Sequence, residues 1–396
     1  MQKYVAYSLI AVGLLFAVCW FTTPFDGFVP CLTNGRSVCD YRFFIQKCLV
    51  EEEPYRPVSI LSRDACYPPI AYCLVKLFPL TSCGELFYVA FLFLGLLAGL
   101  VLFLWQRERR QMFLCLGAVL VTIPFASGPL RGNPSAWSAG ALFVYLAWFD
   151  SPAIWKRMVA AAALGLAAAL KVTPAIYGLL YLRGSLFLPE KWPKEEIFVA
   201  VLSFVMLFAL PFVFFGGPNA VDSWMCNALA NSQHYGRLAD FGLVPVAYQL
   251  GFARSPVLLS FAVHLTTALA LLFCLAACHT RRLYLSLTLL GVAMVFLCHH
   301  DYGLVYLLPA FACWIGEDRS TVARGWNMRG ILAVESVLWF LVLESALCVH
   351  SAFAFRLYGN TSNGSIVMLG LLSFATIVSR RLESTWNLRE HTPPSA

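Results

Sequence analysis

The stretch LFYVAFLFLGLLAGLVLFL, residues 86–104, runs for 19 residues without a charged side chain. The hydrocarbon core of a bilayer is crossed by a helix of about 20 apolar residues, so this stretch predicts a transmembrane helix. The whole chain has the same character, because 60% of its 396 residues are hydrophobic and only 12% are charged. Soluble domains carry about 25% charged residues. The composition therefore predicts an integral membrane protein.

Further apolar runs on both sides of this stretch predict a bundle of such helices. None of them alternates between apolar and polar residues, as the strands of a membrane β-barrel do. The candidate spans cover approximately residues 4–21, 84–104, 111–128, 134–149, 158–182, 196–217, 257–278, 283–298, 303–316, 331–350 and 365–379. The expected fold is all-α, a polytopic bundle of about 10–12 spans in a single domain over residues 1–396. We favour an uncleaved first span over a signal peptide, because no small-x-small cleavage site follows it.

Lysines and arginines gather at the ends of these spans and predict the orientation, since cytoplasmic loops are rich in both. The clusters are Arg107, Arg109 and Arg110; Lys156 and Arg157; Arg183, Lys191 and Lys194; Arg281 and Arg282; Arg319, Arg324 and Arg329; Arg380 and Arg381. All of them fall on one side if residues 158–182 enter and leave on that side, as two half-helices. Topology then accounts for the net charge of +7, and a nucleic-acid partner is not expected.

The opposite, extracytoplasmic side then receives two long loops, residues 22–83 and 218–256, and residues 380–396 form a cytoplasmic tail. The first loop holds Cys31, Cys39, Cys48, Cys66, Cys73 and Cys83. Some of them would form disulfides in an oxidising compartment, in a pairing that the sequence does not give. A zinc site is less favoured, because the loop has no C-x-x-C pair and no histidine.

Asp40 is the first candidate functional residue. It lies in the first outer loop, after the first span, and precedes Tyr41 in a chain that is otherwise poor in charge. A carboxylate at membrane depth indicates a functional site, whereas an aspartate on a solvated loop commonly caps a helix, here one starting at Tyr41. Position alone leaves both interpretations open.

Three more groups on the expected outer side carry polar residues or breaks. Pro68 and Pro69 in YPPIAYCLVKLFP, residues 67–79, predict the start of a short interfacial helix. The stretch SGPLRGNPS, residues 127–135, makes a tight break that contains Arg131 and Asn133. Lys171 lies in an apolar run just before Pro174, and a buried ammonium there needs an anionic partner. A phosphate ligand or a structural carboxylate would serve, and we favour the ligand.

A histidine-bearing hairpin and an amphipathic stretch complete the candidates. His299, His300 and Asp301 in CHHDYGLVYLLPA, residues 298–310, suit a metal site, a proton relay or a phosphate clamp. Three adjacent residues on a helix do not all face one metal, which weakens the first of these. Asn231 lies in WMCNALANSQHYG, residues 224–236, which would lie at the headgroup level.

In this order the features resemble glycosyltransferase family 87, membrane enzymes of the GT-C superfamily. The resemblance extends from about residue 4 to 316 and rests on order and spacing. The matching residues are Asp40-Tyr41, Tyr67-Pro68-Pro69, Gly132-Asn133, Lys171-Val172-Thr173-Pro174, Asn231-Ser232 and His299-His300 with Pro309. The chain departs from the family pattern at Asn133, where glutamine is commoner, and at Ser232-Gln233, which stand in reversed order.

The resemblance implies a GT-C-type fold and transfer of a hexose, mannose above all, from a polyprenyl-phosphate donor to a lipid-linked or glycan acceptor, with inversion. It places the reaction on the extracytoplasmic face of a bacterial inner membrane, with membrane lipid as a partner. Asp40 is then the expected general base. Lys171, Arg131, His299 and His300 are expected to bind the donor phosphate, and Tyr41, Tyr67, Asn133, Asn231 and Asp301 to line the substrates. No metal ion or other cofactor is expected.

Two alternatives stay open from the sequence. The first is a secondary transporter or lipid flippase, in which the same charged residues would form coupling or substrate sites. The second is a non-catalytic subunit of an envelope-polysaccharide complex that has kept the fold.

Overall fold

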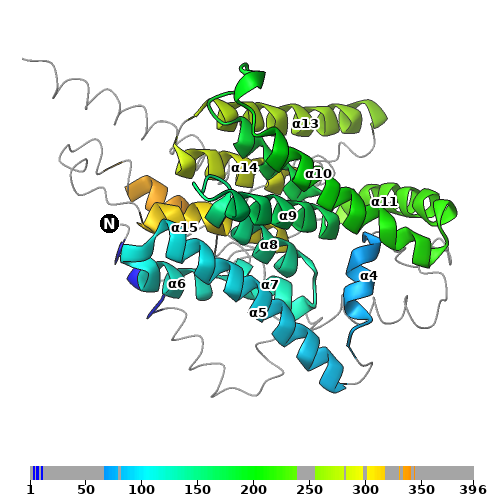
Figure 1. Cartoon of the computed structure of the whole chain (residues 1–396), viewed down its shortest axis with the longest axis horizontal. Helices are drawn as coiled ribbons and strands as arrows, with labels where there is room; N and C mark the ends of the chain where they lie inside the picture. The colour runs from blue at the N-terminus through cyan, green and yellow to red at the C-terminus, as the bar shows by residue number, and fades with distance from the viewer. Residues whose placement is uncertain are drawn as a thin grey trace, which may run out of the picture.

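The computed structural model of the chain describes residues 67–78, 82–238, 255–280, 282–297 and 301–316, with parts of 3–11 and 330–343. These residues form a helical bundle without a strand, so the all-α prediction is confirmed for them (Figure 1). The helices are α4 (Pro69–Val75), α5 (Ser82–Arg107), α6 (Met112–Leu120), α7 (Ile123–Arg131), α8 (Ser135–Trp148), α9 (Ile154–Leu170), η4 (Thr173–Leu182), α10 (Lys194–Ala209), η6 (Leu210–Phe215), α11 (Pro218–Leu238), α13 (Pro256–His279), α14 (Leu283–Leu297), η8 (Asp301–Leu307) and α15 (Leu308–Gly316). Those labelled η are 3-10 helices.

Several of these helices are long and apolar enough to cross a membrane. Within the residues described there are 3, namely Gly84–Arg107, Lys194–Phe215 and Val257–His279. They become 4 if Arg109–Leu120 and Pro124–Leu130, which meet at 79°, are one broken span. This confirms an integral membrane protein. The total of 10–12 spans stays a prediction, since the expected span 365–379 and most of 4–21 and 331–350 lie outside the described residues.

Glycines allow α5 and α8 to approach each other closely. A Cβ atom added to Gly99 of α5 would lie 2.3 Å from the carbonyl oxygen of Gly140 in α8. One added to Gly140 would lie 2.5 Å from the carbonyl oxygen of Gly95. Lipid tails are as apolar as leucine, so membrane helices associate by close packing of small residues, as at this Gly-x-x-x-Gly pair.

Tyrosines satisfy the backbone of the 3-10 segments inside the bundle. The Tyr145 hydroxyl of α8 donates to the Tyr177 carbonyl of η4 at 3.1 Å, and the Tyr177 hydroxyl donates to the Tyr306 carbonyl of η8 at 2.6 Å. The Tyr306 hydroxyl donates to Ser138 Oγ at 3.0 Å, and this hydroxyl donates to the Ala167 carbonyl of α9 at 2.9 Å. Irregular backbone at membrane depth needs such partners. These bonds join η4 and η8 to each other and to α8.

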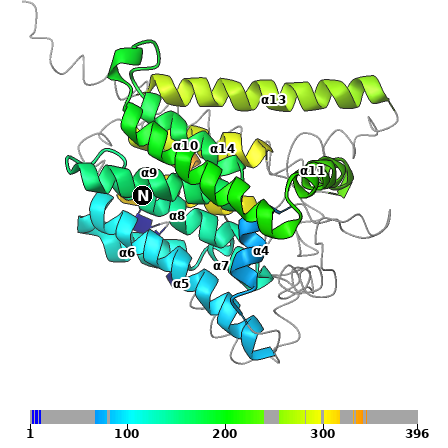
Figure 2. The same cartoon turned by 45° about the vertical axis from the view of Figure 1, so that its right-hand side comes forward.

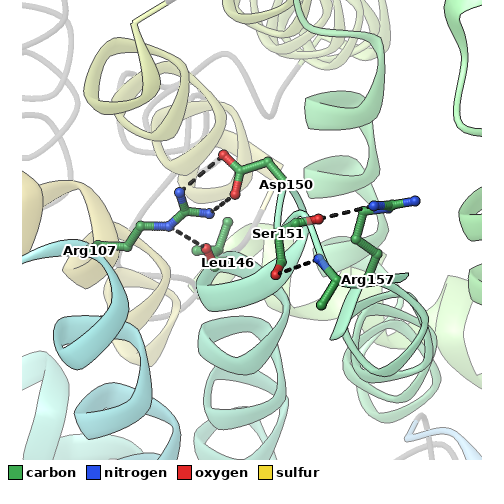
Figure 3. A network of polar contacts seen from close by, with 6 residues as sticks. Arg107, Leu146, Asp150, Ser151 and Arg157 are labelled. Carbon is green, nitrogen blue, oxygen red and sulfur yellow. Dashed lines mark hydrogen bonds and ion pairs between the residues drawn. The ribbon is translucent and has the colours of Figure 1, made fainter. Parts of the chain in front are cut away.

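One end of the bundle collects the basic residues and is called the basic end below. Arg107 at the end of α5 forms an ion pair with Asp150, which follows α8, and donates to the Leu146 carbonyl at 3.0 Å (Figure 3). In the first turn of α9, Arg157 donates to the Ser151 carbonyl at 3.1 Å. The ends of α5 and α8 and the start of α9 therefore meet here.

Three other chain segments return to the basic end. The amide of Gly184, just after Arg183, donates to the Cys278 carbonyl at the end of α13 at 2.8 Å. The side chain of Gln111 donates to the Gly316 carbonyl at the end of α15 at 3.2 Å. Residues 158–182 therefore run away from the basic end in α9 and return to it in η4, as the two half-helices that were predicted. Helix α4 lies at the other end of the bundle, away from α6 (Figures 1 and 2).

Candidate active site

Four polar side chains from three separate parts of the chain form one line of hydrogen bonds at the end opposite the basic end. Lys171 Nζ donates to Ser135 Oγ at 3.0 Å, and Ser135 Oγ donates to Asn133 Oδ1. The amide nitrogen of Asn133 donates to the Tyr67 hydroxyl at 2.8 Å. Three of these residues were predicted site residues separated by up to 104 positions in sequence, and the fold brings them together. We call these four residues the Lys171 chain.

The turn between α7 and α8 fixes Asn133. Helix α7 ends at Gly132, whose φ of 73° lies in the left-handed region that glycine adopts without a steric penalty. The Asn133 amide then donates to the Gly128 carbonyl at 2.9 Å, which closes the helix end. The Asn133 side chain in turn accepts from the Ser135 amide at 2.9 Å, as an asparagine cap does before a proline in the first turn. Asn133 is fully buried, so the turn aims its amide at Tyr67.

A helix break positions Lys171. Pro174 lacks an N–H and its ring would clash with the carbonyl four residues earlier, so α9 ends at Leu170. Lys171 itself is extended, with φ −156° and ψ 113°, and the chain resumes as η4. Its half-buried side chain reaches α8 from the C-terminal end of α9, where the helix dipole favours a cation.

The double proline positions Tyr67. Pro68 precedes α4 and Pro69 begins it, which confirms the short helix predicted for this stretch. Tyr72 of α4 packs edge-on against Phe215 of η6 with ring centroids 6.2 Å apart. Lys76 Nζ lies 4.8 Å from the centroid of the same Phe215 ring. These contacts fix α4 against the bundle and place the Tyr67 hydroxyl next to Asn133.

The hydrogen bonds of the Lys171 chain share a direction. Donation runs from the ammonium to Ser135 and on to Asn133, whose amide donates to Tyr67. Hydrogen bonds in series polarise one another, and a charged donor makes them stronger. Tyr67 accepts from Asn133 through its hydroxyl oxygen. The arrangement therefore fixes the position of the Lys171 ammonium relative to Tyr67.

The other predicted site residues are placed less fully. Arg131 is the last residue of α7, Asn231 lies in α11 and Asp301 begins η8, which packs against α7. Asp40, Tyr41, His299 and His300 lie outside the residues that the structure describes. Their roles, and that of any disulfide in the first outer loop, stay predictions.

Ser135 is the member of the Lys171 chain that the sequence analysis did not single out. It ends the stretch SGPLRGNPS, in which asparagine and proline announce a helix start. A residue two positions after an asparagine cap donates its amide to that cap, which places its side chain beside it. That spacing is the signal that would have identified Ser135.

Comparison with known proteins identifies the family of this chain. A model of glycosyltransferase family 87 matches residues 65–300, which is more than half of the chain and contains all four residues of the Lys171 chain. Searches among curated proteins and among solved structures gave no match. The chain therefore belongs to glycosyltransferase family 87 and is a membrane-embedded transferase.

Proposed function

We propose that this glycosyltransferase moves a hexose, mannose above all, from a polyprenyl-phosphate donor to a lipid-linked or glycan acceptor, with inversion. The observation that carries the proposal is the ammonium of Lys171, which lies at a helix break and donates to Ser135. An ammonium half-buried in an apolar bundle suits an anionic ligand delivered from the membrane. Membership in a transferase family speaks against the transporter and scaffold alternatives.

The leaving group of this reaction is a lipid phosphate, whose negative charge grows as the glycosidic bond breaks. Fixed donors and cations aimed at that charge lower the barrier, because they need no reorganisation during the reaction. Lys171 supplies the cation, and Tyr67, whose hydroxyl accepts from Asn133, is proposed to line the substrates beside it. Arg131, His299 and His300 are further candidates to bind the phosphate.

The acceptor hydroxyl must lose a proton as it attacks, and Asp40 is the proposed base. A carboxylate is the ordinary choice for this step, and the resemblance of Asp40-Tyr41 to the family pattern supports it. Tyr41, Asn231 and Asp301 are proposed to line the substrates.

The basic end is proposed to face the cytoplasm, because arginine and lysine mark cytoplasmic loops. The Lys171 chain would then face the extracytoplasmic side, where a polyprenyl-phosphate sugar and a glycan acceptor meet. The resemblance suggests a bacterial inner membrane.

A panel of polyprenyl-phosphate sugars offered to the purified protein in lipid nanodiscs tests the proposal. Acceptor-dependent consumption of one donor is expected, and Lys171→Met should lower kcat/KM by about 100-fold or more. Lys156→Met is the matched control, since it removes the same charge from the other end of α9 and should retain activity. Equal activity of both variants would contradict the role of Lys171. Movement of donor across proteoliposomes without sugar transfer would contradict the proposed reaction.

A further inference from the structure

The basic end contains one arginine that differs from its neighbours. Arg107 is paired with Asp150, and Arg157 donates to Glu196 at 2.5 Å. Arg183, which follows η4, makes neither an ion pair nor a hydrogen bond through its guanidinium within the described part of the chain, and its Nη1 atom is buried there without an acceptor.

Arg183 shares an aromatic ring with Arg107. The guanidinium carbon of Arg107 lies 5.1 Å from the centroid of the Phe149 ring, and that of Arg183 lies 5.9 Å from it. Burial lowers the pKa of Arg183, as expected of a cation that has lost water, and Asp150 only partly opposes this. The guanidinium nevertheless stays charged. Asp150 is engaged by both terminal nitrogens of Arg107, so two arginines and one carboxylate leave a positive charge here.

Two further donors near this ring also lack an acceptor among the described residues. They are the hydroxyl of Tyr181 and the indole nitrogen of Trp148, which directly precedes Phe149. The Tyr181 ring packs edge-on to Tyr145 at 5.5 Å, and Tyr145 packs against Phe149 at the same distance. Buried donors normally have acceptors. Arg183 itself, a cation whose guanidinium has no acceptor among these residues, calls for a negatively charged group with acceptor oxygens.

Exposed aromatic side chains place this region at a membrane surface. Trp105 is 49% exposed, Trp155 is 58% exposed and Phe187 is 79% exposed, and all three lie within four residues of an arginine or lysine of the basic end. Aromatic residues gather at the headgroup level on both sides of a bilayer. In a bilayer, these aromatic side chains would place Arg183 at the depth of the lipid phosphates.

We propose that Arg183, with Arg107 beside it on Phe149, binds a phosphate group at the membrane surface of the basic end. Two sources share this chemistry, the headgroup of an anionic phospholipid and free phosphate. The planar guanidinium binds phosphate oxygens through two parallel hydrogen bonds. The site lies at the opposite end of the bundle from the Lys171 chain and does not depend on the proposed sugar donor.

The test measures the Tm of the full-length protein in nanodiscs of phosphatidylcholine, with and without phosphatidylglycerol, and in phosphatidylcholine with inorganic phosphate. We expect anionic lipid to raise the Tm of the wild type by several degrees, and Arg183→Gln to lose most of that increase. Arg109→Gln is the matched control, because Arg109 is exposed at the same end and stacks on Trp105 at 4.7 Å. It should keep the increase.

The results with phosphatidylglycerol and with inorganic phosphate distinguish a lipid headgroup from free phosphate. An increase from phosphatidylglycerol that requires Arg183 supports a lipid headgroup, and an equal increase from inorganic phosphate supports free phosphate. Equal increases in both glutamine variants would overturn the proposal. If Arg183→Gln does not fold, Arg183→Lys is the second variant. It keeps the positive charge but lacks the two parallel donors of a guanidinium, so it should lose part of the increase in Tm. A wild type that gains nothing from either phosphate source, and retains no anionic lipid in native mass spectrometry, would also overturn it.

Discussion

The two ends of the bundle use polar side chains in different ways. At the basic end, arginines pair with carboxylates from other segments of the chain, as in Arg107 with Asp150 and Arg157 with Glu196. At the opposite end, the Lys171 ammonium donates to Ser135, Ser135 donates to Asn133, and Asn133 donates to Tyr67. Ion pairs join helix ends at the basic end, whereas neutral side chains hold the ammonium of Lys171 in place at the other end. The difference suggests that one end maintains the assembly and the other prepares a site for an anion.

The largest expected effect is that of Asp40→Asn, the change at the proposed general base. Asp40→Asn should lower kcat by about 100- to 10,000-fold, because it removes the proposed general base. Donor binding, measured by equilibrium dialysis of a labelled donor, should be retained. Asp26→Asn is the control from the same expected loop and should keep wild-type kcat. A high activity of Asp40→Asn would move the base to another residue.

At the basic end, removing a carboxylate should lower stability and leave activity per folded molecule unchanged. Glu196 has a side chain only 5% exposed, whereas that of Asp150 is 43% exposed. Glu196→Gln should therefore destabilise by on the order of 2–3 kcal/mol, since it removes the carboxylate that balances the charge of Arg157. Asp150→Asn should cost about 1 kcal/mol or less, because water screens the pair.

Thermal unfolding in one detergent measures both variants, with kcat/KM determined on the folded fraction. If Asp150→Asn proves the more destabilising, exposure does not govern the strength of these pairs. A loss of kcat/KM in either variant would remove the contrast between the two ends.

Ser135 tests whether the Lys171 chain positions its cation. Ser135→Ala should raise the KM for the donor and lower kcat/KM by about tenfold, which corresponds to one lost hydrogen bond to a charged group. Ser135→Thr keeps a hydroxyl and should recover most of the loss. Ser138→Ala, one turn further along α8, is the control. It removes the bonds to Tyr306 and Ala167 and should lower Tm without a selective effect on KM.

Much of the fold follows from the sequence, because long apolar runs and prolines act locally. The run around residues 86–104 became α5, and Pro174 divided residues 158–182 into two half-helices as expected. The 3-10 form of η4 was not predicted. The hydroxyl of Tyr145, from another helix, satisfies one carbonyl of η4.

The candidate site was predictable only where its residues contrast with their surroundings. Lys171 and Asn133 stand out as polar groups in apolar sequence, and Tyr67 is marked by the prolines after it. Ser135 does not stand out, since serine is common in membrane helices. Its role arises from the packing of α8 on α9, which brings Lys171 to it from 36 positions away. No local sequence pattern predicts a contact between residues so far apart in the chain.

The smallest expected effect is a difference in labelling rate between two cysteines near the Lys171 end. Cys73 of α4 is half-buried and Cys226 of α11 is exposed. Burial raises the pKa of the Cys73 thiol, an effect that nearby Lys76 only partly opposes. Since the thiolate is the reactive form, a membrane-impermeant maleimide should modify Cys226 faster than Cys73 at pH 7. The rate at Cys73 should still rise as the pH is increased to 9, because the fraction of thiolate grows throughout that interval.

Peptide mass spectrometry on intact cells, with permeabilised cells as the control, measures both rates. Labelling from outside at both positions would place the Lys171 end on the extracytoplasmic side, and labelling only after permeabilisation would reverse the proposed orientation.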